Sequence, residues 1–168
     1  MLSIEIFGEV FAQQRPRFSR IRNHVRTYDP QTKEKDQYRW QIKSQFRNEP
    51  ITVPLLLVIK FFLPIPKATS QVKKKEMIAD LLHHQKKPDI DNLAKFVLDC
   101  MNGIVFKDDS QIYKLFLEKR YAQNEGILIL IDPYCHQKED QDAAREGKIE
   151  EDSFIKHKKT KRRRVSAG

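Results

Sequence analysis

Hydrophobic positions recur along this chain in spacings that predict a mixture of strands and helices. Residues 2–7 alternate, with Leu2, Ile4 and Ile6 on one face, as expected for a half-buried strand. Three later segments are rich in apolar and β-branched residues and are bounded by turn residues, which also predicts strands. These segments are residues 51–63, 112–120 and 127–131.

Two other segments carry apolar residues at helical spacing. Tyr38, Ile42 and Phe46 recur every four residues and predict a helix over 31–48, with Phe46 and the nearby Trp40 in the core. The strongest helical pattern covers 91–102, where Gly103 supplies the stop. Its predicted buried face consists of Leu93, Phe96, Val97, Cys100 and Met101.

The remaining segments lack a clear period. Residues 8–30 are predicted to be a long connection without regular structure, and the basic stretch 67–87 a short helix or flap. Strands followed by helices in this order predict an α+β domain, with a mixed, mainly antiparallel sheet and helices packed on it. We expect this domain to span 1–132 and residues 133–168 to be a charged, disordered tail.

Charge narrows the class of partner. The chain of 168 residues has a formal charge of +9, and most of the excess lies before the tail. A basic body favours a polyanionic partner, nucleic acid before membrane. The two cysteines are too few for a disulfide framework, and the start lacks the pattern of a signal peptide. We therefore expect a reduced, cytoplasmic protein associated with the nucleoid.

Basic residues gather in two places that suit DNA contact: the predicted connection 8–30 and the stretch just before Asp89. The predicted connection 8–30 carries several arginines with Phe18 and Tyr28 among them, so guanidinium groups can contact phosphates while an aromatic ring stacks on a base. The alternative is a solvated loop. The candidate DNA-binding residues are Arg15, Arg17, Arg20, Arg22, Lys86 and Lys87.

Aspartates form the most specific pattern. Asp89 and Asp91 stand at the start of the predicted helix, and Asp108 and Asp109 follow its end. Mg²⁺ prefers oxygen ligands, and a bound metal supports phosphodiester hydrolysis. An antiparallel return of the chain can bring the second pair beside the first. The alternatives are structural: Asp91 as helix N-cap, an ion pair between Asp91 and Lys95, and an ordinary turn at 107–111.

The stretches "KPDIDNLAKFVLDCMNG" and "FKDDSQIYKLFLEKRY" resemble the signature of the RusA family of Holliday junction resolvases. The resemblance covers about residues 1–132; a lysine often precedes the Arg-Pro-Arg of that family, whereas this chain has glutamines. It implies a homodimeric endonuclease that depends on Mg²⁺, with Mn²⁺ as an alternative ion. It assigns metal binding to Asp89, Asp91 and Asp109, with Asp108 as a further candidate, and a catalytic role to Lys95.

The implied activity is the resolution of four-way DNA junctions by paired symmetric nicks in recombination and repair. A four-way junction has a two-fold axis, so two symmetric cuts require two sites related by such an axis, which agrees with a homodimer. Two alternatives remain open from the sequence. One is a non-catalytic protein that binds branched DNA, and the other is a less selective nuclease of branched DNA.

Overall fold

The computed structural model describes residues 1–21 and 24–133. The candidate residue Arg22 and almost all of the predicted tail therefore lie outside the described residues. The elements follow one another as β1 (Leu2–Phe7), β2 (Arg17–Ile21), β3 (His24–Tyr28), α1 (Thr32–Gln45), β4 (Leu55–Pro64), α2 (Gln71–Ile78), α3 (Ile90–Met101), a 3₁₀ turn η1 (Asp109–Gln111), β5 (Ile112–Ala122) and β6 (Gly126–Pro133).

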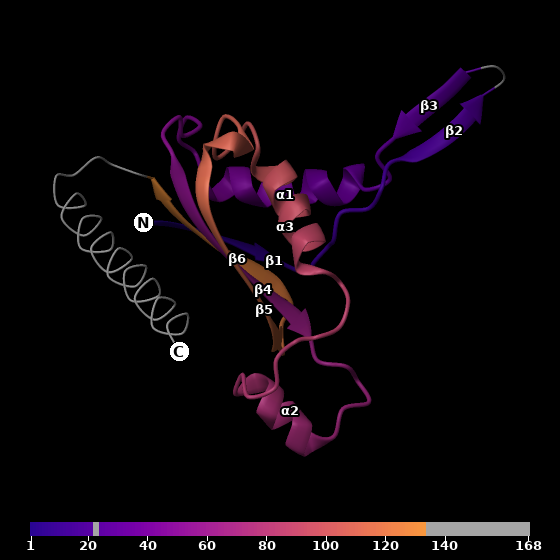
Figure 1. The fold of residues 1–168 in the computed structure, drawn as a ribbon, viewed down its shortest axis with the longest axis vertical. Helices are drawn as coiled ribbons and strands as arrows, with labels where there is room; N and C mark the ends of the chain where they lie inside the picture. The colour runs from indigo at the N-terminus through magenta and orange to yellow at the C-terminus, as the bar shows by residue number, and fades with distance from the viewer. Residues whose placement is uncertain (22–23, 134–168) are drawn as a thin grey trace, which may run out of the picture. The chain divides into compact units, whose positions relative to one another are not determined.

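Four strands form the main sheet in the order β1-β6-β4-β5 (Figure 1). β6 pairs antiparallel with both β1 and β4, whereas β5 pairs parallel with β4. A parallel neighbour requires a crossover connection, and the segment carrying α2 and α3 supplies it. The predicted α+β class with a mixed, mainly antiparallel sheet is confirmed.

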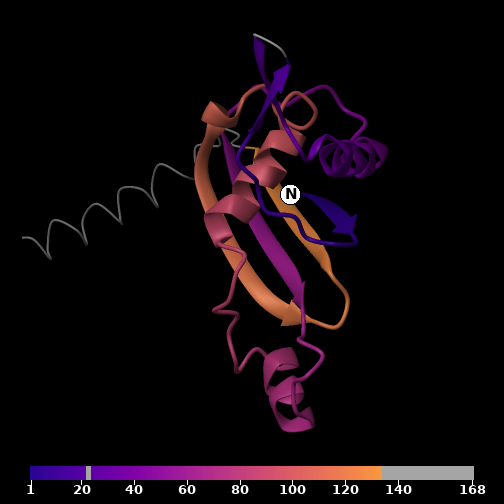
Figure 2. The same cartoon turned by 90° about the vertical axis from the view of Figure 1, so that its right-hand side faces the viewer.

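One face of this sheet forms the core with α1 and α3 (Figure 2). Alternate residues of β4, such as Leu57, Ile59 and Phe61, are fully buried because successive side chains of a strand point to opposite faces. The predicted stripes of both helices are buried as well, including Tyr38 and Phe96, whose rings meet edge to face at 5.2 Å. Burial of these stripes fixes α3 against the sheet.

The segment 8–30 is not the structureless connection that was predicted. It contains the two-stranded β2–β3 hairpin, which projects away from the main sheet in Figure 1. Its strands RFSRI and HVRTY do not alternate regularly between apolar and polar residues, and Phe18 is 73% exposed. The hairpin buries little apolar surface. Its sequence therefore lacks the apolar periodicity that predicts a core strand.

Two smaller predictions were also wrong. Trp40 is 72% exposed on α1 instead of lying in the core, although Phe46 is buried as expected. The strand predicted to begin at residue 51 begins at Leu55 instead, because residues 51–54 contribute only an isolated bridge from Ile51 to Phe106. In the part of the chain that the structure describes, no helix is long and apolar enough to cross a membrane.

Candidate functional site

The start of α3 presents the first pair of aspartates. Asp89 occupies the N-cap position, and Asp91 is the second residue of the helix, so the alternative that placed the cap at Asp91 was wrong by two residues. The Asp89 side chain makes no capping hydrogen bond, and both carboxylates are exposed. The positive end of the helix dipole stabilises negative charge at this position. Both carboxylates are therefore available to a ligand.

A lysine from the sheet fixes the backbone just before this pair. Lys119 of β5 donates from Nζ to the carbonyl oxygens of Lys86 and Pro88, at 2.9 and 3.0 Å. The second of these carbonyls immediately precedes Asp89 along the chain. An ammonium group that bonds two carbonyls restricts the rotation of the intervening peptide units. Lys119 thus couples the position of Asp89 to the sheet.

The arginine-bearing loop also lies against this end of α3. The backbone N–H of Gln13 donates to the carbonyl oxygen of Asn92 at 2.9 Å. Arg15 and Arg17 follow two and four residues later, and both are exposed. The loop that was predicted to contact DNA therefore starts beside the two aspartates.

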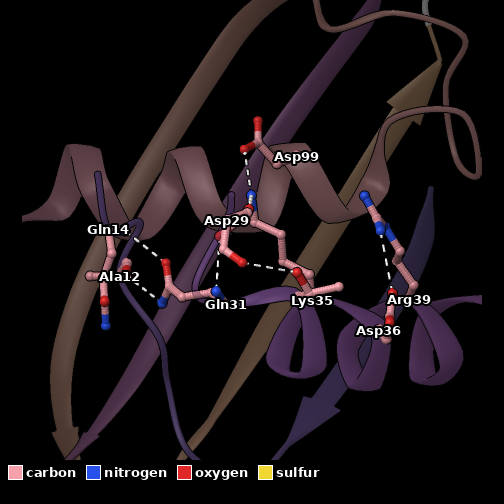
Figure 3. A network of polar contacts seen from close by, with 9 residues as sticks. Ala12, Gln14, Asp29, Gln31, Lys35, Asp36, Arg39 and Asp99 are labelled. Atoms are coloured by element: carbon pink, nitrogen blue, oxygen red, sulfur yellow. Dashed lines mark hydrogen bonds and ion pairs between the residues drawn. The ribbon is translucent and has the colours of Figure 1, made fainter. Parts of the chain in front are cut away.

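Gln31 holds the same loop from the other side (Figure 3). Its Oε1 accepts from the backbone N–H of Gln14 at 2.7 Å, and its Nε2 donates to the carbonyl of Ala12 at 3.0 Å. Gln31 is only 3% exposed, so these bonds replace the water that its amide would otherwise bind. The loop is consequently clamped between α1 and α3.

A buried lysine joins three elements beneath the loop (Figure 3). Lys35 of α1 contacts Asp29 at 2.8 Å and Asp99 of α3 at 3.1 Å. Burial opposes the charge of Lys35, but the two carboxylates outweigh it and raise its pKa. The pKa of Asp29 is lowered chiefly by the hydrogen bond that it accepts from Lys35. The hydrogen bond from the backbone N–H of Gln31 lowers it further. Both groups are therefore charged at neutral pH.

The other candidate DNA-binding side chains that the structure describes are exposed. Arg20 of the hairpin is exposed, as are Lys86 and Lys87 just before Asp89. Lys86 and Lys73 of α2 line an open hollow of about 700 Å³. Arg120 attaches this region to β5, since its guanidinium bonds Asp80 just after α2 at 2.6 Å.

The second pair of aspartates lies at the other end of α3. Asp108 forms a capping box with Gln111: its carboxylate accepts from the N–H of Ser110 at 2.9 Å, and Gln111 Oε1 accepts from the N–H of Asp108. The Ser110 side chain and backbone lower the pKa of Asp108. Asp109 is exposed and follows directly in η1. Asp108 thus serves the turn, as one of the structural alternatives proposed.

The structure does not bring the two pairs together within one chain. α3 has 12 residues, so its ends lie about 18 Å apart. The length of β5 gives a similar separation. Ile112 lies just after Asp109, and Lys119 bonds the carbonyl of Pro88, just before Asp89. About seven residues of strand, roughly 23 Å, lie between Ile112 and Lys119. Among residues 1–21 and 24–133, no three His, Cys, Asp or Glu side chains are placed to hold one metal ion.

Lys95 lies one turn after Asp91 on the exposed side of α3. The ion pair between Lys95 and Asp91 that was an alternative to catalysis is absent from the described residues, where the salt bridges involve other lysines and arginines. The ammonium group of Lys95 is therefore exposed and available at the same end of the helix as the aspartate pair.

Three residues of this site were not predicted from the sequence. Lys119 bonds Lys86, 33 positions away, and Lys35 bonds Asp99, 64 positions away. Gln31 bonds the backbone of Gln14, 17 positions away. The sequence signal for Lys35 is its position three residues before Tyr38, on the apolar stripe of α1. For Lys119 and Gln31 the sequence offers no comparable signal.

Residues 8–132 match the family model of the endodeoxyribonuclease RusA. The chain belongs to the RusA endodeoxyribonuclease family, whose members resolve Holliday junctions. It is also 37% identical over 134 residues to the uncharacterized protein YqaN of Bacillus subtilis strain 168, with 77% of this chain and 94% of that protein covered. The family resemblance drawn from the aspartate motifs is thereby confirmed.

Proposed function

We propose that this protein is a Mg²⁺-dependent endonuclease that resolves four-way DNA junctions by paired symmetric nicks in recombination and repair. The observation that carries this proposal is the α3 start, where two exposed aspartates, Lys95 and an arginine-bearing loop converge. Each part suits one requirement of phosphodiester hydrolysis: a metal ion, a cation near the phosphate, and contact with the DNA backbone.

The donors at the α3 start fit Mg²⁺. This ion commonly takes one or two carboxylates, several waters and phosphate oxygens of its substrate, and Asp89 and Asp91 supply the two carboxylates. A Mg²⁺ ion held by these two carboxylates would supply an activated water and positive charge beside the phosphate. Mn²⁺, with a similar preference for oxygen, is an alternative occupant. The family resemblance assigns Asp109 to the same metal as well, but within one chain Asp109 lies at the opposite end of α3.

The other residues act on the DNA. Lys95 places a positive charge one helical turn from Asp91, where it stabilises charge that develops on the scissile phosphate. Arg15, Arg17 and Arg20 lie on the clamped loop and the hairpin beyond it and bind phosphates of the adjoining duplex. Lys86 and Lys87 extend the positive surface on the other side of Asp89. Arg22 belongs to this set by sequence.

The two-fold symmetry of the junction requires a second, equivalent site for the second nick. A homodimer provides one, since each chain carries a single α3 start. The exposed aromatic ring of Phe18, on the projecting hairpin, suits stacking on a base that is unpaired at the branch point. This combination favours branched DNA over a linear duplex as the substrate.

The proposal is tested with the variant Asp91→Asn on a synthetic four-way junction. We expect cleavage to be lost while junction binding is retained, because the substitution removes a metal ligand and leaves the basic surface intact. Unchanged cleavage by this variant would refute the assigned site. A wild-type protein that binds junctions without cutting them in Mg²⁺ or Mn²⁺ would show a non-catalytic branched-DNA-binding protein.

Selectivity is tested by comparing cutting rates on four-way, three-way and linear DNA of the same sequence. A resolvase is expected to cut the four-way junction fastest and in pairs. Equal rates on all three substrates would identify a less selective nuclease of branched DNA and end the resolvase proposal.

A further inference from the structure

An open hollow lies next to α2, along the part of the chain that precedes the aspartate pair. Its volume is about 700 Å³, which is within the range of pockets that bind small organic ligands. The residues that line it come from the turn after β4, from α2, from the segment 82–86 and from the end of β5. Both views place α2 beyond one end of the main sheet, away from α1 and the β2–β3 hairpin (Figures 1 and 2).

The most deeply buried residues of the hollow are apolar. Met77 of α2 and Tyr121 of β5 line it and are 8% and 6% exposed. The ring of His84 packs on that of Tyr121, with the ring centroids 4.6 Å apart. Arg120 holds the end of α2 to β5 through its contact of 2.6 Å with Asp80. Contacts within the chain therefore keep the hollow open, and its floor offers apolar surface against which a flat ring can pack.

The rim of the hollow is basic and polar. Lys73 and Lys86 both line it, and both are exposed. Gln85 adds an amide that can donate and accept hydrogen bonds, and Ser70 adds a hydroxyl. Within the described part of the chain, none of the residues that line the hollow is acidic. A matching ligand combines a flat ring that has polar edges with negative charge, as a nucleotide does.

Lys86 relates the hollow to the aspartate pair. Its side chain lines the hollow, and its carbonyl oxygen accepts a hydrogen bond from Lys119 at 2.9 Å. Asp89 lies three residues further along, so at most about 11 Å of extended backbone separates it from Lys86. A DNA strand with a phosphate at the aspartate pair therefore has a neighbouring nucleotide within reach of the hollow. A hollow of this size admits one nucleotide and not a duplex, so that nucleotide has to leave the base stack.

We propose that the hollow binds one unpaired nucleotide of the strand that is cut, with its base against Met77 and Tyr121 and its phosphate beside Lys73 and Lys86. This inference rests on the proposed function for the DNA substrate. Extrusion of a base costs least where pairing is already interrupted, so the hollow favours a branch point. Gln85 can bond the polar edge of the base, which gives a preference for particular bases next to the cut.

A photochemical cross-link tests where the base lies. 5-Iodouracil is placed at one nucleotide at a time around the branch point of a synthetic four-way junction, and the complex is irradiated in the presence of a chelator. Mass spectrometry then identifies the cross-linked residue. We expect one nucleotide position to cross-link to Met77, His83 or Tyr121, which line the hollow. Cross-links only to residues outside the hollow, or none from a junction that is bound, would overturn the proposal.

A variant with a filled hollow tests whether the base contributes to cleavage. Ala68→Trp adds a large side chain to the wall of the hollow, and Ala79→Trp, at an exposed position outside the lining, is the matched control. Ala68→Trp is expected to slow junction cleavage about tenfold, the effect of one lost stacking contact, with Mn²⁺ binding unchanged. Equal cleavage rates for the two variants would overturn the proposal.

An abasic nucleotide at the cross-linked position keeps the phosphate and removes only the base. With the wild-type protein it should slow cleavage as much as Ala68→Trp does, and combining the two changes should give no further loss, because both remove the same contact. An abasic nucleotide that leaves wild-type cleavage unchanged would overturn the placement of a base in the hollow.

Two lysines of α2 test the position of the phosphate. Lys73→Ala should reduce the slope of log K against log salt for junction binding by about one, whereas Lys75→Ala, on the same helix but outside the lining, should leave it unchanged. Equal slopes would overturn the contact with Lys73. A protein that gives the cross-link but cuts no branched DNA would keep the nucleotide site and lose the proposed function. Paired nicking without the cross-link would show the reverse.

Discussion

The two ends of α3 carry the same type of residue in opposite circumstances. At the C-terminal end, the carboxylate of Asp108 is engaged by Ser110 in a capping box. At the N-terminal end, Asp89 makes no capping bond and its backbone is held by Lys119 from the sheet. A carboxylate that the chain itself satisfies serves the fold, whereas one that the chain positions without satisfying is available to a ligand.

Support from the rest of the molecule follows the same division. The N-terminal end receives the loop clamped by Gln31 and the arginines that follow it, whereas the C-terminal end is tied through Gln111 to the carbonyls of Ile51 and Val53. Contacts with distant residues therefore support both ends of α3, and at the N-terminal end they hold the backbone beside Asp89 and Asp91.

Removing one carboxylate from the N-terminal end is expected to have the greatest effect on activity. Asp89→Asn should lower the cleavage rate about a thousandfold, since it deletes a ligand of the ion that activates water. Single-turnover cleavage of a four-way junction at saturating protein measures this loss. Asp36→Asn, an exposed aspartate on α1, is the matched control. Equal cleavage rates for the two variants would mean that Asp89 matters no more for cleavage than an exposed aspartate elsewhere on the surface.

Lys119 is expected to act on position and not on the phosphate. Lys119→Met should slow cleavage about tenfold to a hundredfold by releasing the carbonyls of Lys86 and Pro88, and should weaken Mn²⁺ binding, with junction affinity nearly unchanged. Lys119→Arg keeps the charge and the donors and should recover part of both. Loss of junction affinity without loss of metal binding would instead assign Lys119 to DNA contact.

The arginines beside the N-terminal end should control affinity. The double variant Arg15→Ala and Arg17→Ala is expected to weaken junction binding and to reduce the slope of log K against log salt by about two, one for each lost phosphate contact. Binding isotherms at several salt concentrations measure that slope. Arg47→Ala with Lys43→Ala, exposed residues at the far end of α1, should leave it unchanged. An unchanged slope in the variant lacking Arg15 and Arg17 would mean that the loop carrying them is solvated and does not contact DNA phosphates.

Lys35 should affect stability more than activity, because it joins α1 to Asp99, near the C-terminal end of α3 and away from the aspartate pair. Lys35→Met is expected to cost about 1–2 kcal/mol, since its partners are partly hydrated and keep some solvation when the cation is removed. Denaturant unfolding measures the difference, with Lys33→Met as the exposed control. A cost no larger than that of the control would mean that the network is held by other contacts.

The same network sets a pH window. The pKa of Lys35 is raised above its ordinary 10.5, so its contribution is present at neutral pH and is lost as pH rises through the folded value. The pKa of Asp29 is lowered below 3.8, so its contribution is lost as pH falls through the folded value. The stability difference between wild type and Lys35→Met should therefore be constant near neutrality and shrink at both extremes.

Elements that form the core could be predicted from the sequence, whereas elements outside it could not. The helix around Leu93 and the strand around Ile59 could be predicted because burial imposes a period on their sequences. The aspartates could be singled out because the residue type and the motif are specific. The β2–β3 hairpin escaped prediction because a hairpin outside the core leaves no apolar period.

Distance in space was the other limit. The pattern of Asp89, Asp91 and Asp109 suggested one cluster, and only the length of α3 and the direction of β5 show that one chain cannot form it. Lys119 was missed for a related reason, because a lysine on an edge strand has no local sign of bonding a loop some 30 residues earlier. Spacing along the chain identifies candidate ligands, but topology decides which of them meet.

The most direct test of the proposed function is to map the cuts on a synthetic four-way junction labelled on each strand, with and without Mg²⁺. We predict two nicks at symmetry-related positions on opposite strands, present with Mg²⁺ and absent with a chelator, and lost in Asp89→Asn. Unpaired cuts scattered over the arms, or cutting that continues unchanged in the chelator, would contradict the account.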